Sequence, residues 1–345
     1  MPKPPEPKPV FGADLTGLNT FSLPATAARL VRISHPQQLT ALPPDQPPMR
    51  LLGEGSNTVF VGDYPGCILL NRIRGVEFSQ SGDSVLVTAG AGENWHALVR
   101  RCLDEQLHGI ENLIMIPGSV GAAPVQNIGA YGVELADVFE RLRAFDLQER
   151  EFVTLSGPDC RFSYRDSLFK SRCPNRFIIC SVTLRLSTSF RPNTGYASLA
   201  NALHKQGIQN PTARQLAAAV MRLRRHRLPD PARLPNAGSF FKNPLVERKQ
   251  ALEILDKHPA LPHWPQADGK IKLAAGWMIE QLGWKGRRMG QVGVYKNHAL
   301  VLVNHGGASG SALVKLVAAI QASVWHGFGI KLEPEPSLPG HQTCE

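Results

Sequence analysis

A short glycine-rich segment in the first fifth of the chain carries residues suited to binding an anion. It reads Gly53-Glu54-Gly55-Ser56-Asn57 and lies between two apolar runs. Glycine permits positive φ and lets a ligand approach the backbone closely. Successive N–H groups in such a turn form a concave nest for an anion, and the Ser56 hydroxyl adds a donor. A pyrophosphate would suit this nest, and a tight turn between two strands is the alternative.

A second, longer stretch is rich in glycine and alanine. It runs from Ile116 to Pro124 and continues from Gln126 to Gly132. Small side chains at this density add little to a core but leave room for a flat ligand against the backbone. The stretch lacks the strand-then-helix frame of a Rossmann GxGxxG, and no Gly-Lys-Ser or Gly-Lys-Thr follows as in a P-loop. Two glycine clusters suggest an extended dinucleotide, FAD or NAD, and two structural loops are the alternative.

Four arginines lie close together in one predicted helix, at Arg222, Arg224, Arg225 and Arg227. Several cations on one helix can bind nucleic acid. The sequence has no RNA-recognition, zinc-finger or homeodomain pattern and no basic run with interleaved aromatic residues. We therefore expect no nucleic-acid partner, and one or two of these arginines binding a diphosphate is the simpler interpretation.

Cysteine and histidine spacing predicts no metal site. The six cysteines form no CxxC pair, and none of the 11 histidines lies in an HExxH pattern. A secreted disulfide scaffold would be shorter and denser in cysteine, so reduced thiols are expected. His298 precedes a predicted strand and is a candidate for a position near a substrate.

Length and charge limit the possibilities further. The 345 residues exceed the size at which one core usually stops growing, which predicts two or three domains. A net charge of +10 permits nucleic acid, an anionic membrane surface or a phosphorylated small molecule as partner and selects none of them. No apolar run reaches the ~18–20 residues that span a bilayer, and the proline-rich N-terminus lacks the apolar core of a signal peptide. These features predict a cytoplasmic protein without membrane insertion.

The elements that must position these residues mix short strands and helices. Strands are expected at 28–33, 58–61, 67–71, 85–89, 177–186 and 298–304, and helices at 93–106, 212–225, 273–282 and 311–325. Without strict βαβ alternation, this order predicts an α+β fold. Residues 1–18 are expected to form a disordered proline-rich tail and residues 43–48 a linker or loop.

Nine segments in one order carry a resemblance to a known family. They are GEGSN, NRI, GAGENWH, IENLIMIPGSVGAAPVQNIGAYGVE, CRFSYRDSLFK, LPDP, NAGSFFKNP, PQADGKIKLAAGWMIEQ and LEPE. Each motif alone is weak. Together, across nearly the whole chain from Asn19 to Glu335, they resemble the UDP-N-acetylenolpyruvoylglucosamine reductases, the MurB family, in its longer subclass with a tyrosine loop.

The resemblance implies a domain organisation and a reaction. It implies an FAD-binding domain of the vanillyl-alcohol-oxidase (PCMH) type at 19–208, with two subdomains divided near residue 75. An α+β substrate-binding domain would follow at 209–325, and a C-terminal segment, 326–345, would return to the active site. The implied enzyme is a monomeric flavin-dependent reductase with non-covalent FAD and NADPH as hydride donor. It reduces UDP-N-acetylglucosamine enolpyruvate to UDP-N-acetylmuramate in peptidoglycan precursor synthesis.

The resemblance also assigns residues to the cofactor. The expected FAD contacts are all in the two glycine-rich segments: Gly53, Gly55, Ser56, Asn57, Pro117, Gly118, Ser119, Gly121, Gly129 and Tyr131. Neither segment contains a histidine or cysteine, the residues to which flavin is covalently attached in related oxidases, so non-covalent binding is expected.

Three residues match catalytic roles of the family. Ser239 matches the proton donor, and because a serine hydroxyl is a poor acid, it must lie within hydrogen-bond reach of the carbon. Arg165 matches a group that faces the substrate carboxylate, which a guanidinium can bind bidentately while stabilising negative charge. Glu335 matches a second group that supports the intermediate, and it is expected to be protonated or hydrogen-bonded when it acts.

The family match also indicates contacts to the substrate, at Tyr164, Tyr196, Arg227, Asn243 and Lys285. Tyr196 lies in an insertion that resembles the tyrosine loop. Two positions depart from the usual pattern. Arg227 stands where lysine is frequent, which keeps the charge and changes its geometry, and Trp264 stands where tyrosine is common and has no phenolic hydroxyl.

Two other functions are alternatives to this one. A flavin oxidase of the same superfamily would pass electrons to oxygen, and it would need no proton donor such as Ser239. A basic nucleotide- or nucleic-acid-binding protein without catalysis would contain no flavin.

Overall fold

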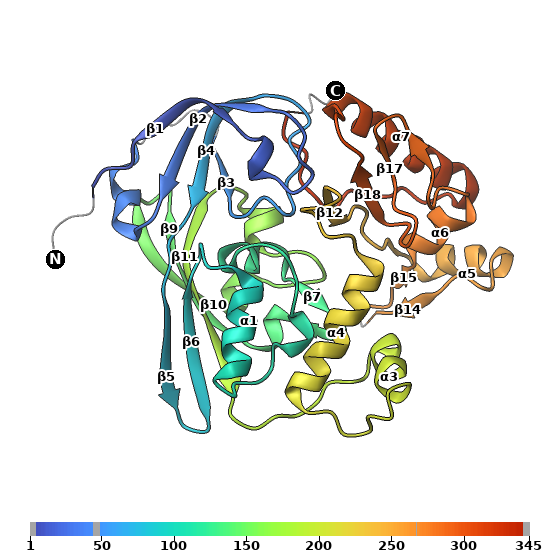
Figure 1. Cartoon of the computed structure of the whole chain (residues 1–345), viewed down its shortest axis with the longest axis horizontal. Helices are drawn as coiled ribbons and strands as arrows, with labels where there is room; N and C mark the ends of the chain where they lie inside the picture. The colour runs from blue at the N-terminus through green and yellow to red at the C-terminus, as the bar shows by residue number, and fades with distance from the viewer. Residues whose placement is uncertain (1–4, 44–48, 267, 341–345) are drawn as a thin grey trace. The chain divides into compact units, whose positions relative to one another are not determined.

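The computed structural model describes residues 5–43, 49–266 and 268–340, so the predicted linker lies outside the described residues except for Pro43. The chain forms two compact units. The N-terminal unit comprises Met1–Ala13, Ala27–Glu54 and Pro65–Arg224, and the C-terminal unit comprises Asp14–Thr26, Gly55–Tyr64 and Arg225–Glu345. Both units mix strands and helices, as the α+β prediction requires (Figure 1).

Two sheets form the framework of the N-terminal unit. The larger is antiparallel, with the order β10 (Glu151–Ser156), β9 (Phe139–Asp146), β11 (Phe177–Ser187), β6 (Ser84–Gly90) and β5 (Val76–Ser81). The smaller has the order β1 (Pro9–Asp14), β2 (Thr26–Ile33), β4 (Tyr64–Asn71) and β3 (Met49–Leu52), and its β3–β4 pair is parallel.

Strand β11 is buried on both faces, which explains why its sequence is a continuous apolar run. Side chains alternate between the two faces of a strand. Ile178 and Cys180 belong to a core that also contains residues of the smaller sheet. A register shift between Ile179 and Ser181 exchanges the faces, so that Val182 belongs to the larger core of the unit.

Three longer helices contribute several residues each to that larger core: α1 (Trp95–Asp104), α3 (Ala197–His204) and α4 (Ala213–Arg227). Helix α1 begins where the Asn94 side chain accepts a hydrogen bond from the Ala97 N–H at 2.9 Å, which satisfies a free donor of the first turn. Short helices connect the remaining strands: α2 (Gly157–Cys160), the 3₁₀ helices η1 (Thr16–Leu18), η2 (Pro36–Ala41), η3 (Glu111–Leu113), η4 (Val120–Ala122), η5 (Pro124–Gln126) and η6 (Leu135–Asp137), and the π-helix η7 (Leu168–Arg172).

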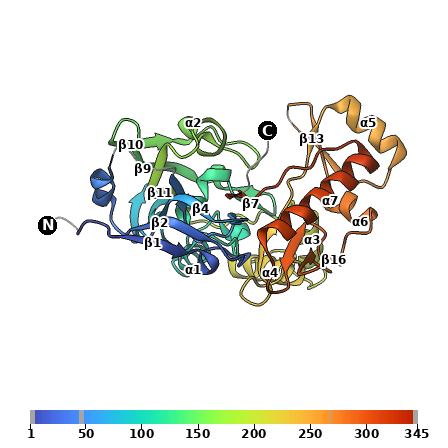
Figure 2. The same ribbon diagram turned by 90° about the horizontal axis from the view of Figure 1, so that it is seen from above.

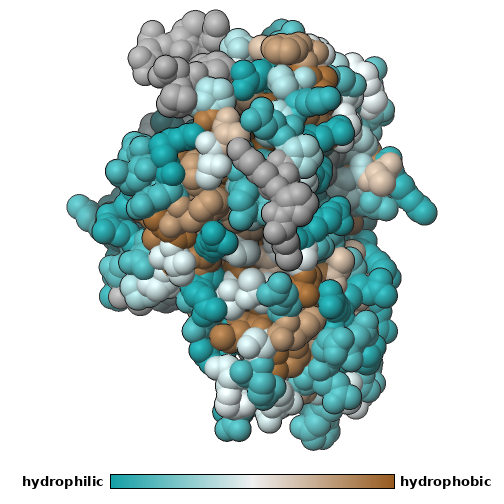
Figure 3. Space-filling model, turned by 90° about the vertical axis from the view of Figure 1, so that its left-hand side faces the viewer, coloured by the Kyte–Doolittle hydropathy of each residue, from teal (hydrophilic) through white to brown (hydrophobic). Residues whose placement is uncertain are grey.

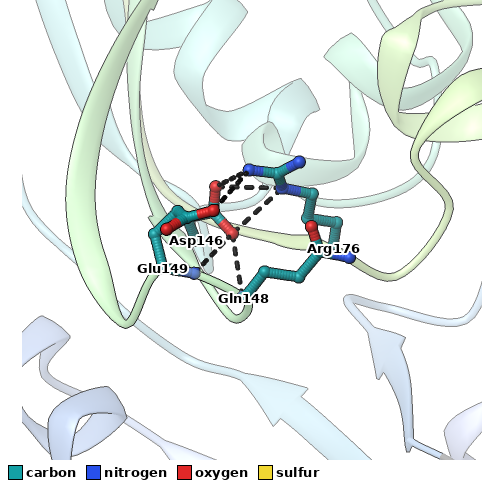
Figure 4. A network of polar contacts seen from close by, with 4 residues as sticks. All are labelled: Asp146, Gln148, Glu149 and Arg176. Atoms are coloured by element: carbon teal, nitrogen blue, oxygen red, sulfur yellow. Dashed lines mark hydrogen bonds and ion pairs between the residues drawn. The ribbon is translucent and has the colours of Figure 1, made fainter.

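An ion pair between a buried carboxylate and a half-buried guanidinium fixes the turn after β9. Figure 4 shows the Arg176 guanidinium facing the Asp146 carboxylate, and Nη2 lies 2.6 Å from Oδ2. The backbone N–H groups of Gln148 and Glu149 also donate to Asp146. Burial raises the pKa of Asp146, but these hydrogen bonds outweigh burial and hold the pKa below its usual value. The pair therefore orders the β9–β10 turn against the start of β11.

The C-terminal unit contains two small antiparallel sheets. One has the order β12 (Asn236–Ser239), β18 (Val301–Asn304), β17 (Val292–Val294) and β16 (Arg288–Met289). The other has the order β13 (Leu245–Val246), β15 (Ile271–Leu273) and β14 (His263–Pro265). Its helices are α5 (Arg248–Lys257), α6 (Ala275–Gln281) and the long α7 (Gly310–Phe328), which Figure 2 shows crossing the unit.

In two segments the secondary structure differs from what the sequence predicts. Residues 9–14, expected to be a disordered tail, form strand β1 beside β2, because main-chain pairing does not depend on their side chains. Residues 58–61 form no strand of a sheet, although Val59 and Val61 donate to the carbonyls of Ser337 and Pro339 at 2.9 and 3.0 Å.

The two units also divide the chain differently from the expected domains. Phe21, Leu23 and Val59 are buried in the C-terminal core, which places two early segments in the C-terminal unit. The division after Glu54 therefore falls inside the first glycine-rich segment, and the last division falls within α4 rather than before it.

The surface combines polar and apolar areas. The face drawn in Figure 3 shows hydrophobic patches among mostly hydrophilic residues. The most exposed large apolar side chain is Phe11 of β1, at 74%, among the described residues. No helix in the described ranges is long and apolar enough to cross a membrane.

Candidate active site

The beginning of the first glycine-rich segment meets the second segment in the N-terminal unit. A Cβ placed on Gly53 would lie 2.2 Å from Oγ of Ser119. Arg72, of the NRI motif, donates through Nη1 to the Gly53 carbonyl at 2.9 Å and so holds the first segment in place. A larger residue at position 53 would therefore displace the Ser119 hydroxyl of the second segment.

The second segment packs against the start of α1. The Trp95 N–H donates to the Gly118 carbonyl at 3.0 Å, and the Val120 N–H donates to the Glu93 carbonyl at 2.8 Å. Ser119 between them is 3% exposed. Within the described residues, the N–H groups of Gly118 and Ser119 donate to no protein acceptor. Buried N–H groups without a protein partner fit an anionic ligand such as the diphosphate of FAD.

A small hairpin displays Tyr131. Strands β7 (Gly129–Ala130) and β8 (Val133–Glu134) pair through the turn Tyr131-Gly132, whose φ values are +50° and +83°. Positive φ at both central residues is typical of a type I′ hairpin turn. The ring of Tyr131 meets the ring of Tyr196 edge-on, with centroids 5.3 Å apart. The tyrosine loop and the glycine-rich segment thus come together.

Asn112 joins these two segments and is not among the residues predicted from the sequence. Its Nδ2 donates to the carbonyls of Tyr131 and Asn193 at 2.8 and 3.0 Å, and the residue is 3% exposed. Its one sequence signal is an amide side chain within an apolar stretch, and that signal does not reveal its partners.

Arg165 is presented by a tight turn. Ser163 and Asp166 exchange two backbone hydrogen bonds of 3.1 Å, and Arg165 between them has φ of +56°. Its Nη2 donates to the Gly129 carbonyl at 2.7 Å, and its Cζ lies 5.6 Å from the centroid of the Tyr164 ring. A non-glycine residue in this conformation is costly and often marks a functional site. The turn brings the guanidinium to the second glycine-rich segment.

A second guanidinium lies near Arg165. Nε of Arg224 is buried and makes no hydrogen bond to any described residue. Burial, together with the charge of Arg165, lowers the pKa of Arg224, whereas Tyr131 acts in the opposite direction. From the sequence, Arg224 is only one of four clustered arginines, because no periodicity distinguishes it from its neighbours.

In the C-terminal unit, Ser239 ends β12 at an irregularity. The pairing of β12 with β18 shifts register between Asn236 and Ser239, and Gly238 between them has φ of +70°. The Asn236 side chain accepts from the Gly238 N–H at 2.9 Å and stabilises this bend. A bulge of this kind redirects the next side chain, and Ser239 is half-buried.

The C-terminal LEPE segment runs beside Ser239. The Glu335 N–H donates to the Phe240 carbonyl at 2.8 Å, and the Lys242 N–H donates to the Glu333 carbonyl at 3.0 Å. On its other side, the Ser337 N–H donates to the Asn57 carbonyl at 3.1 Å. One unit thus brings together Glu335, the residues next to Ser239 and part of the first glycine-rich segment.

The remainder of that glycine-rich segment is tightly constrained. Gly55 has φ of +66°, and a Cβ there would lie 1.9 Å from the Leu18 carbonyl oxygen. The N–H groups of Gly55 and Ser56 donate to no acceptor in the described part of the chain. These two donors are available to an anion, as the nest hypothesis requires.

The expected substrate contacts divide between the units. Tyr164 and Tyr196 belong to the N-terminal unit, whereas Arg227, Asn243 and Lys285 belong to the C-terminal unit. Lys285 pairs with Glu280 at 2.7 Å.

Asn243 and Trp264, two residues of the expected substrate site, contact other residues of the C-terminal unit. Oδ1 of Asn243 accepts from the Ala275 N–H at 3.0 Å, at the start of α6. Its amide nitrogen thus remains the group that could meet a ligand. Trp264 is 43% exposed, and the Lys272 ammonium lies 5.8 Å from its ring centroid.

Comparisons with known proteins agree with this geometry. The model "FAD binding domain" matches residues 41–155, and the model "UDP-N-acetylenolpyruvoylglucosamine reductase, C-terminal domain" matches residues 230–338. The chain is 46% identical over 332 residues to the UDP-N-acetylenolpyruvoylglucosamine reductase of Dechloromonas aromatica, covering 95% of this chain and 98% of the relative. It is 49% identical over 333 residues to the enzyme of that name from Azoarcus sp., covering 94% and 96%.

A solved structure has the same fold. The MurB reductase of Thermus caldophilus matches with a TM-score of 0.67 at 23% identity, over 96% of this chain and 98% of that one. This likeness confirms the expected fold, and the relatives confirm the expected family. The chain belongs to the UDP-N-acetylenolpyruvoylglucosamine reductase (MurB) family.

Proposed function

We propose that this chain reduces UDP-N-acetylglucosamine enolpyruvate to UDP-N-acetylmuramate with NADPH and non-covalent FAD, in peptidoglycan precursor synthesis. One observation carries the proposal beyond family membership: the backbone pairing that sets Glu335 beside Phe240, next to Ser239. An oxidase that transfers electrons to oxygen needs no such proton-donating arrangement.

The backbone donors of the glycine-rich segments would hold the cofactor. In the N-terminal unit the N–H groups of Gly118 and Ser119 are available donors, and in the C-terminal unit those of Gly55 and Ser56 are; each pair is proposed to contact FAD. Gly53, Pro117, Gly121, Gly129 and Tyr131 would shape the same site, and Asn57 would border it. When bound, FAD supplies the carrier that takes a hydride from NADPH and passes it to the enolpyruvyl group.

Ser239 is the proposed proton donor. A hydride delivered to the β-carbon leaves negative charge on the α-carbon, and the Ser239 hydroxyl would give its proton to that carbon. The reaction therefore adds one hydride and one proton across the double bond. Because serine is a weak acid, the step depends on close positioning, which the bend at Gly238 and the pairing with β18 provide.

Arg165 and Glu335 would support the charge that develops. That charge is conjugated with the substrate carboxylate, and a guanidinium can bind both carboxylate oxygens. Arg165 is already held by Gly129 at 2.7 Å, so little reorganisation is needed when the substrate binds. Glu335 would act at the α-carbon beside Ser239.

The nucleotide part of the substrate would be held elsewhere. Arg227 and Lys285 are the proposed cations for the diphosphate, and the Asn243 amide nitrogen is a proposed donor. Tyr196 is 44% exposed on its loop and, with Tyr164, is proposed to cover the substrate. Trp264 would offer only its ring face and indole N–H there.

The compartment and oligomeric state are part of the proposal. The five described cysteines are free, and four of them are buried, which suits the reducing cytoplasm. Ser239 and Glu335 come from one chain, so a monomer would suffice. Light scattering on the purified protein should give the mass of one chain, and a dimer would contradict the monomer proposal.

The purified protein should be yellow and should consume NADPH beyond one equivalent per flavin only when the enolpyruvyl nucleotide is present. One NADPH should be consumed for each UDP-N-acetylmuramate formed, measured by absorbance and product chromatography. NADPH consumption that depends on oxygen instead would favour the oxidase alternative, and a colourless protein that gains no activity with added FAD would overturn the enzyme assignment.

A further inference from the structure

The second glycine-rich segment contains a buried asparagine, Asn127, to which the mechanism above gives no role. The residue ends the short helix η5, is 1% exposed and has φ of +43°. Asparagine is one of the few residues besides glycine that adopt this left-handed conformation readily. A buried amide is almost always hydrogen-bonded, so the partners of this side chain show which segments it holds together.

The Asn127 side chain bonds to two other segments of the N-terminal unit. Its Nδ2 donates to the Ser163 carbonyl at 3.3 Å and to Oε2 of Glu134 at 2.7 Å. Its Oδ1 accepts from the Ala136 N–H at 3.0 Å. Both amide hydrogens and the carbonyl oxygen therefore have protein partners, and the amide has a defined orientation.

The first of these partners begins the turn that presents Arg165. The Ser163 carbonyl also accepts from the Asp166 N–H at 3.1 Å, which closes the turn around Arg165. Arg165 has φ of +56° within this turn. A carbonyl oxygen has two lone pairs, so Ser163 can accept from Asp166 and from Asn127 at once. Asn127 thereby anchors the backbone that carries Arg165.

The guanidinium of Arg165 is held near the same asparagine. Its Nη2 donates at 2.7 Å to the carbonyl of Gly129, two residues after Asn127. A Cβ built on Gly129 would lie 3.1 Å from Nη1 of Arg165 and 3.0 Å from Cγ of Glu134, the residue whose carboxylate Asn127 binds. The contacts thus form a closed ring that runs from Asn127 through the turn to the guanidinium and back through Gly129.

We propose that Asn127 is a positioning residue for Arg165, which fixes both the backbone and the guanidinium of that arginine relative to the second glycine-rich segment. The inference rests on the proposed function, because it takes Arg165 as the group that binds the substrate carboxylate. A bidentate contact requires the guanidinium plane to be correctly placed. A misplacement of about 1 Å by a change outside the reacting groups can cost roughly 100-fold in rate.

Anaerobic single-turnover kinetics on the FAD-loaded full chain test the inference. Asn127→Gly removes the side chain and keeps a residue suited to positive φ. NADPH should reduce its flavin at the wild-type rate, whereas reoxidation by the enolpyruvyl nucleotide should slow about 10–100-fold. Asn175→Gly is the matched control, since Asn175 also has positive φ, +60°, and is exposed. Both steps should be unchanged in the control.

A second variant covers the case in which Asn127→Gly does not fold. Asn127→Asp retains an acceptor for the Ala136 N–H and tolerates the left-handed backbone, but it loses both donors of the amide. Its reoxidation step should be slowed in the same way. Reoxidation at the wild-type rate in either variant would overturn the inference, and so would equal slowing of both steps, which would indicate a general structural role.

A double-mutant cycle shows whether Asn127 acts through Arg165. With Arg165→Ala already present, no guanidinium remains to be positioned, so Asn127→Gly should slow reoxidation by less than about threefold more. A further loss as large as in the wild-type background would overturn the positioning role. If wild type itself is not reoxidised by the enolpyruvyl nucleotide, the proposed function fails, and this inference fails with it.

Discussion

The backbone N–H of Glu335 donates to the carbonyl oxygen of Phe240 at 2.8 Å. This bond links two segments that are far apart in the sequence and fixes the carboxyl-bearing residue next to Ser239. Phe240 is in turn fixed by its own N–H, which donates to the Leu300 carbonyl at 2.7 Å. The segment around Glu335 is therefore held against the end of β12, where Ser239 lies.

Glu335→Gln should lower turnover by about 10²–10⁴-fold, the usual contribution of a positioned acid or base, and leave the melting temperature unchanged. The backbone bond to Phe240 is retained in this variant, so the change isolates the carboxyl group. Glu333→Gln is the matched control, since Glu333 is 69% exposed at its side chain and pairs only with Lys242 at 3.2 Å among the described residues. Steady-state kinetics should show little change in the control, and equal losses in both variants would contradict a specific role for Glu335.

Arg165→Lys should lower turnover by roughly 10²–10³-fold, because an ammonium cannot bind a carboxylate through two parallel hydrogen bonds. Reduction of the flavin by NADPH should be unaffected. Arg161 is a suitable control, since it also has positive φ, +48°, and is exposed. Single-turnover kinetics of Arg165→Lys that match those of Arg161→Lys would exclude the carboxylate-binding role.

Gly55→Ala should lower both FAD retention and stability. The new Cβ would meet the Leu18 carbonyl oxygen at 1.9 Å, in addition to the cost of a positive φ. Gly82 separates the two effects, because its φ is +61° and a Cβ there meets nothing within 4 Å. Gly82→Ala should cost only ~1–2 kcal/mol in unfolding free energy and retain full flavin. Flavin-to-protein ratios and thermal melts measure both, and equal behaviour of the two variants would show that the close approach is unimportant.

Asn112→Ala should raise KM for the enolpyruvyl nucleotide more than it lowers turnover. It removes the donor shared by the carbonyls of Tyr131 and Asn193, so the tyrosine loop would lose one of its connections to the glycine-rich segment. Leaving buried acceptors unpaired should also cost ~1–3 kcal/mol of stability. Asn193→Ala removes only a side-chain bond to the Gly132 carbonyl and should have the smaller effect on stability. An unchanged KM in Asn112→Ala would contradict the positioning role.

Regular elements with strong periodicity could be predicted from the sequence. Helices α1, α4 and α7 lie close to the predicted ranges because each has an apolar face and a recognisable first residue. Strand β1 and the irregular run 58–61 could not be predicted, because their backbone partners come from distant parts of the chain.

The candidate site likewise contains residues that could be predicted from the sequence and residues that could not. The glycine-rich segments predict a dinucleotide site because glycine permits positive φ and lets a ligand approach the backbone closely. Ser239, Arg165 and Glu335 were identified through the order of the motifs, since each residue alone has an ordinary structural explanation. Asn112 and Arg224 depend on contacts that form only in the folded chain, and no local pattern distinguishes them.

The most direct test is a two-step anaerobic experiment on Ser239→Ala and wild type. NADPH should bleach the flavin of both proteins at the same rate. Subsequent addition of UDP-N-acetylglucosamine enolpyruvate should restore the yellow colour of wild type rapidly and that of Ser239→Ala about 10²–10⁴-fold more slowly. Equal recovery in the two proteins would contradict the assignment of Ser239 as proton donor, and with it the central claim about this site.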